Sequence, residues 1–103
     1  MQTTAPQPIA PAQLLALQTE WRGLHEQLIK TQLWALKIAA TIAAQEYFND
    51  PTQENDLLRV KAICALDDER RNDPVTAQLE KRHHEIIGLV EAHYEAVAAK
   101  SKL

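Results

Sequence analysis

The chain has 103 residues, 46% of them hydrophobic and 24% charged, with a formal net charge of −3. This length and balance predict one modest globular domain. The acidic balance gives the chain no general attraction to nucleic acid or to an anionic membrane, so neither is an expected partner.

The residue usage favours helices along the whole chain. Ala, Leu, Gln and Glu are abundant, whereas there are only two glycines. These common residues keep their rotamer freedom in a helix, and no segment alternates polar and apolar residues long enough to predict a strand. We therefore expect an all-α fold.

The single cysteine, Cys64, excludes an intrachain disulfide and fits a reducing, cytoplasmic location. We expect its side chain to act as a small buried hydrophobe.

The two ends of the chain carry weaker patterns. Residues 1–11 hold three prolines and predict a short flexible lead, followed by one helical domain over 12–103. The lead has no basic residue and no long apolar run, so it does not resemble a secretory signal. The final tripeptide, 101–103, matches a peroxisomal targeting signal, and it also fits a helix tail whose lysines favour the helix dipole.

Two Asp-Pro pairs divide the helical domain. Asp50-Pro51 and Asp73-Pro74 each place a capping residue before a proline that suits the first turn of a helix, and each pair ends the preceding helix. They predict helices over about 12–48, 51–70 and 74–100. With such short links we expect a three-helix bundle, or an extended helical hairpin with a long first helix.

The N-terminal half of the first predicted helix carries one apolar stripe. At 1.5 Å per residue this helix is about 55 Å long and the second about 30 Å, so the second helix returns only to about residue 30. The stripe is then left without cover from its own chain, which predicts an interface unless the helix bends near Gly23. We expect a homodimer, with Trp21 as its main anchor. The expected interface residues are Leu14, Leu17, Trp21, Leu24 and Leu28.

The following segment, 31–44, is the least polar stretch of the chain. Its single charge, Lys37, and its length, shorter than the roughly 20 residues of a membrane span, argue against a transmembrane helix. Apolar residues lie on two opposed sides of this segment. We expect the second helix to cover one side and the third helix the other, which would make the segment ordinary core.

Candidate metal ligands occur in the last predicted helix. Glu80 and His83 have the Glu-x-x-His spacing of di-iron bundle helices, and His93 lies three turns further along. A di-iron site needs this motif twice, so a metal-binding bundle would need a dimer. The favoured interpretation is that His83 and His93 are partly buried, hydrogen-bonded interface residues, with His84 exposed and no cofactor bound.

Catalysis and nucleic-acid binding have little support. Ser101 is the only serine, the sole cysteine lies among apolar residues, and two glycines cannot form a phosphate-binding loop, so we expect no enzyme and no catalytic residues. Basic residues at 69–71 and 80–84 alternate with acids, which leaves a dimeric nucleic-acid regulator as a secondary hypothesis.

The sequence best fits a small soluble helical interaction module of the adaptor, chaperone or accessory-subunit type, which binds another protein or itself.

Overall fold

The computed structural model describes residues 7–101, and the predicted all-α class is confirmed. The prediction of three helices is wrong, since this part of the chain forms four. Their bounds are α1 Pro11–Leu28, α2 Gln32–Asn49, α3 Gln53–Asn72 and α4 Pro74–Ser101. Part of the predicted flexible lead, residues 1–6, lies outside the described residues, as do Lys102 and Leu103 of the C-terminal tripeptide.

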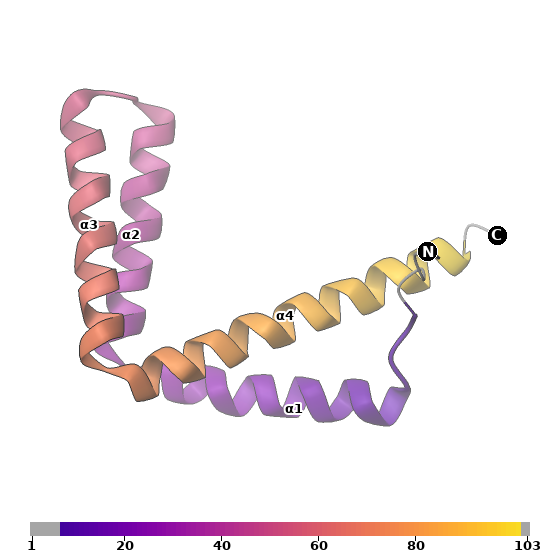
Figure 1. The fold of residues 1–103 in the computed structure, drawn as a ribbon. Helices are drawn as coiled ribbons and strands as arrows, with labels where there is room; N and C mark the ends of the chain where they lie inside the picture. Colours follow the sequence, from indigo (N-terminus) through magenta and orange to yellow (C-terminus); the bar gives the residue numbers. More distant parts are fainter. Residues whose placement is uncertain (1–6, 102–103) are drawn as a thin grey trace, which may run out of the picture.

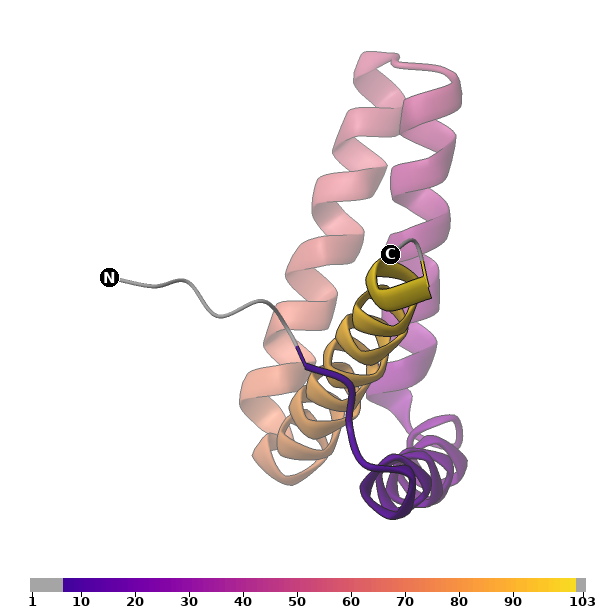
Figure 2. The same cartoon turned by 90° about the vertical axis from the view of Figure 1, so that its right-hand side faces the viewer.

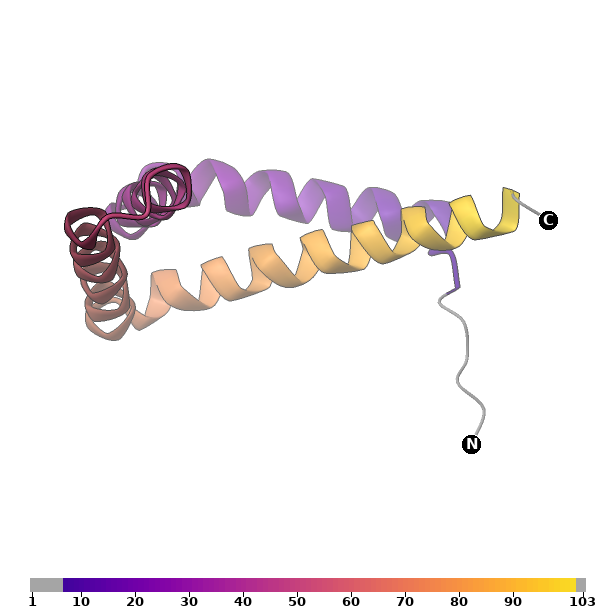
Figure 3. The ribbon, with the colours of Figure 1, turned by 90° about the horizontal axis from the view of Figure 1, so that it is seen from above.

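The four helices form two arms that meet at a corner (Figure 1). Helices α2 and α3 pack as one antiparallel pair, the α2–α3 arm, and α1 and α4 form a second antiparallel pair, the α1–α4 arm. Seen from above, α1 and α4 run side by side away from the corner (Figure 3), and the end-on view of that arm shows the α2–α3 arm rising across it (Figure 2). The molecule, 49 × 31 × 27 Å, is neither a three-helix bundle nor an extended hairpin.

The predicted long helix over 12–48 is broken between α1 and α2. Thr31 is extended, with φ −94° and ψ 155°, and its hydroxyl accepts a hydrogen bond from the Trp34 N–H at 3.2 Å. The same hydroxyl donates to the Leu28 carbonyl at 2.7 Å, so one side chain caps both helix ends. A bend near Gly23 is not observed: Gly23 lies inside α1, and a Cβ added there would meet nothing within 4 Å in the described structure.

Replacing this cap gives a first test of the corner. Thr31→Ala removes both hydrogen bonds, and we expect the free energy of unfolding to fall by about 1 kcal/mol in a denaturant titration. Thr41→Ala is the matched control, because the exposed Thr41 hydroxyl only donates to Lys37 O within α2, at 2.9 Å. The control should change stability by less than about 0.5 kcal/mol. Equal losses would contradict a capping role for Thr31.

The other two links follow the Asp-Pro pairs with one difference. Asp73 caps α4 as expected, since its carboxylate accepts a hydrogen bond from the Thr76 N–H at 3.2 Å. The Thr76 hydroxyl also donates to this carboxylate, and this bond, followed by the backbone bond, holds the pKa of Asp73 below its usual value. Before α3, however, the cap is Thr52 and not Asp50: the Thr52 hydroxyl accepts from the Asn55 N–H at 3.1 Å, and α3 begins after the proline.

Each arm has its own small core. In the α2–α3 arm the buried apolar residues are Leu33, Ala40 and Leu66. In the other arm α4 buries Ile86 and Ala96 along the side that faces α1, and Leu28 is fully buried at the end of α1. Cys64, expected in the core, is exposed on α3. The apolar burial is modest for a chain of this size, which makes the polar contacts at the corner important.

Candidate functional site

The predicted interface stripe on α1 is covered by its own chain. Leu28 is fully buried, and Leu14, Leu17, Trp21 and Leu24 are all partly buried. The cover comes from α4, which runs along α1 in the opposite direction (Figure 3). The premise that nothing in the chain covers this stripe is therefore wrong, because α1 ends at the corner and α4 has the length to return along it.

More of the exposed large apolar side chains lie on the α2–α3 arm than on the α1–α4 arm, which exposes five of them: Leu15, Val75, Leu89, Tyr94 and Val97. On α2, Ile38 and Ile42 are 49% and 53% exposed and lie on the side of the helix opposite Leu33 and Ala40, which pack against α3. The expectation that α3 and α4 would cover both sides of this segment is wrong. Seven large apolar side chains of the arm are exposed: Ile38, Ile42, Phe48, Leu57, Leu58, Val60 and Ile63.

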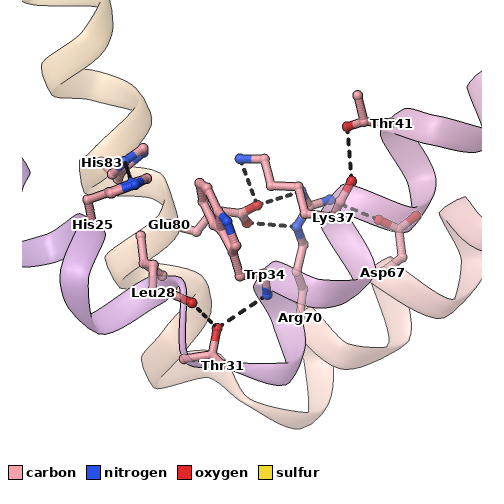
Figure 4. Close-up of polar contacts among 10 residues, drawn as sticks. All are labelled: His25, Leu28, Thr31, Trp34, Lys37, Thr41, Asp67, Arg70, Glu80 and His83. Atoms are coloured by element: carbon pink, nitrogen blue, oxygen red, sulfur yellow. Dashed lines mark hydrogen bonds and ion pairs between the residues drawn. The ribbon is translucent and has the colours of Figure 1, made fainter. Parts of the chain in front are cut away.

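At the corner a buried carboxylate joins three helices (Figure 4). Glu80 of α4 is 7% exposed and accepts two hydrogen bonds from the Arg70 guanidinium of α3, at 2.8 and 2.9 Å. The Lys37 ammonium of α2 lies 3.2 Å from the same carboxylate. The Arg70 hydrogen bonds, and next those of Lys37, hold the pKa of Glu80 below its usual value, although burial acts in the opposite direction.

Beside this ion network four aromatic rings join α1, α2 and α4. The Trp21 ring stacks on His25 with centroids 4.7 Å apart, and the Trp34 ring meets the His83 ring edge-on at 5.4 Å. His25 Nδ1 and His83 Nε2 lie 3.2 Å apart, within hydrogen-bonding distance. Figure 4 shows these two imidazoles side by side, next to the Glu80 network. His25 had no role in the sequence analysis, since nothing in the pattern relates it to a residue 58 positions away.

The protonation states of this histidine pair follow from its surroundings. His83 Nδ1 is buried and, within the described residues, has no hydrogen-bond partner. A bare ring nitrogen costs less there than an unpaired N–H, so we assign the His83 proton to Nε2, which donates to His25 Nδ1. Burial, and next the proximity of His25 and Lys37, lower the pKa of His83.

The three candidate metal ligands do not form a metal site. Glu80 is committed to Arg70 and Lys37, and His83 faces His25. His93, further along α4, accepts a hydrogen bond from the Ile9 N–H at 2.8 Å. Over residues 7–101, no group of three or more His, Cys, Asp or Glu side chains is placed to hold a metal ion. Both histidines are buried in the described structure, and each has a ring nitrogen within hydrogen-bonding distance of a partner.

A groove lies between α1 and α4 on one side of their arm. Its volume is about 410 Å³, and Trp21, Ile86 and Val90 form part of its wall, with Arg22 and Glu91 also lining it. This size and lining suit a small apolar group or a partner side chain. Its polar lining consists of Gln18, Arg22 and Glu91.

Among the residues described, no helix is long and apolar enough to cross a membrane. Comparison of the chain with protein-family models, with curated proteins and with solved structures finds no match.

Proposed function

We propose that this protein is a helical interaction module whose docking element is the α2–α3 arm. One observation carries the proposal: this arm exposes seven large apolar side chains and fully or nearly fully buries only Leu33 and Leu66 among its large apolar residues. Soluble monomers rarely leave apolar surface of this extent uncovered. The α1–α4 arm exposes five such side chains, so the α2–α3 arm is the better candidate for packing within a larger helical assembly.

The partner that best fits this surface is a second copy of the chain. The outward side of α2 carries Ala35, Ile38 and Ile42. An identical stripe can pack against it in a two-fold pair, in which Lys37 is already bonded to Glu80 and the exposed Glu46 lies toward the same side as Ile42. The small side chain of Ala35 would allow the two helices to approach closely, as in other helix–helix contacts.

The number of exposed side chains favours a contact that uses both helices of the arm. A standard interface buries about 800 Å² per partner. The seven side chains are between 38% and 82% exposed, and they lie on more than one side of the arm. An arm–arm contact that uses α2 and α3 together, as in a helical bundle, would cover most of them. This proposal replaces the α1 stripe with the α2–α3 arm as the surface of the homodimer expected from the sequence.

Charged residues on the outward stripe should prevent this association. In sedimentation at increasing protein concentration we expect the wild-type chain to form a dimer or larger species and the double variant Ile38→Asp/Ile42→Asp to remain a monomer. Because both side chains are half-exposed, helix content should be unchanged. Leu15→Asp is the matched control on α1, where Leu15 is 66% exposed, and it should associate like the wild type. A wild-type chain that stays monomeric throughout would contradict self-association.

A further inference from the structure

The His25–His83 contact is the least exposed polar link between the helices α1 and α4 in the described structure. The two nitrogens are 3.2 Å apart, and only one proton can occupy the space between them. The other cross-links of this arm are more exposed: Arg82 donates to Glu20 at 2.7 and 2.8 Å, and Gln18 donates to Tyr94 at 3.5 Å. The histidine pair differs from these two links in depending on ring protonation; the hydrogen bond from Ile9, before α1, to His93 of α4 also ends on a ring nitrogen.

A further proton has no favourable position in the pair. In the assigned state the open nitrogens are His25 Nδ1, which faces the His83 N–H, and His83 Nδ1, which is buried among the described residues without a partner. Protonation at the first places two N–H groups against each other, and protonation at the second creates an unpaired buried N–H. Either step opposes the contact between α1 and α4.

The charged groups around the pair do not compensate an added positive charge. From α2, Lys37 contributes a cation, and from α4 the exposed His84 is a further titratable ring. Glu80 is the nearest anion, but it already pairs with Lys37 and, from α3, with Arg70. On α1 the pair meets the Trp21 ring, whose indole N–H is itself buried without a partner in the described structure.

We propose that the His25–His83 pair is a pH-sensitive latch that holds α1 against α4 when both rings are neutral and releases α1 when the pair gains a proton. Release would separate the α1 stripe from α4 at the corner. The Glu80 network would remain, because its carboxylate stays ionised at the pH at which imidazole titrates. The latch is thus a change in one arm, with the contact among α2, α3 and α4 preserved.

The direction of the pH effect follows from the lowered pKa of His83. A free imidazole has a pKa of about 6.5, so the released state binds a proton more readily than the closed state. The stabilisation of the closed state is fully present above about pH 6.5. It decreases as the pH falls from there toward the lower pKa that His83 has in the closed state. For one linked proton, the ratio of released to closed molecules rises about tenfold per pH unit in this window.

A distance measurement across the α1–α4 arm tests the latch. Spin labels at Ala12→Cys and Ala99→Cys, in a Cys64→Ser background, report the separation of the two helices. Labelled chain is diluted with unlabelled chain, so the result does not depend on self-association. We expect one short distance at pH 8 and a growing population of longer distances as the pH falls from 6.5 to 5, with helix content retained.

Two variants and a control decide the result. His83→Gln should remove the pH dependence, because glutamine keeps a polar side chain that does not titrate, and His25→Gln provides the same test if the first variant does not fold. His84→Gln changes the neighbouring exposed ring and should behave like the wild type. Identical distances at pH 8 and pH 5 in the wild type, or a pH effect that survives in both pair variants, would overturn the proposal.

Discussion

Ile86→Ala is expected to lower the free energy of unfolding by about 3 kcal/mol, within the range for removing a fully buried aliphatic side chain. Ile86 is 0% exposed in the middle of α4, and with Trp21 it forms part of the wall of the groove between α1 and α4. The loss includes the transfer of the removed methyl and methylene groups to water and the cavity that they leave. Because each arm has few buried apolar residues, the loss is a large share of the stability of a chain of this size.

The control for this change lies on the same helix. Leu89 is 45% exposed, so Leu89→Ala removes a similar volume from a site that water already reaches. We expect a loss of about 1 kcal/mol or less. Urea titrations of the two variants at one pH give the comparison. Similar losses for both would mean that α4 does not pack on α1 through the side that carries Ile86.

Glu80→Ala is the second change with a large expected effect, a loss of about 2 kcal/mol. Removing a buried charged partner leaves the opposite charges uncompensated. The effect is smaller than for a fully enclosed pair, since the side chains of Lys37 and Arg70 are 32% and 37% exposed and can turn toward water. Glu85→Ala is the control on the exposed side of α4, where the 3.6 Å contact with Arg82 should contribute little.

The same carboxylate makes a contribution to stability that is also lost as the pH falls, but in a lower pH range than that of the histidine latch. The pKa of Glu80 is held low chiefly by the Arg70 hydrogen bonds, so its contribution is present above the usual glutamate pKa of about 4.5 and is lost as the pH falls through the lower folded value. Subtracting the stability of Glu80→Ala from that of the wild type should give a difference that is constant above about pH 5 and shrinks below pH 4.5. A constant difference down to pH 3 would contradict the ionised network.

The all-α class was predictable because composition and the two Asp-Pro pairs both favour it. The break at Thr31 was not recognised, since it contains no glycine or proline and the apolar spacing continues through it, from Leu28 to Thr31 and Ala35. The available cue was Thr31 itself, since threonine is a preferred capping residue. Its hydroxyl accepts a hydrogen bond from the N–H of Trp34, three positions later. Without this break, α1 and α2 were predicted as one long helix.

That single error inverted the prediction of the exposed surface. With a continuous first helix, the segment 14–28 has no partner and the segment 31–44 has two; with a corner at Thr31, α4 covers the first segment and the outer side of the second is free. The corner cluster was equally hidden, because His25 and His83 meet only through the path of the chain between them. Periodicity identifies the apolar sides of a helix, but it does not identify which of them the chain covers.

The central claim, that the outward side of α2 binds a second copy, is tested most directly by site-specific photo-crosslinking. A photoreactive residue replaces Ala35 on this side, or Gln27 on α1 as the control; both positions are exposed. We predict a covalent dimer from position 35, with the crosslink mapped to the α2–α3 arm of the other chain, and little or none from position 27. Absence of a dimer at position 35, or equal yields at the two positions, would contradict it.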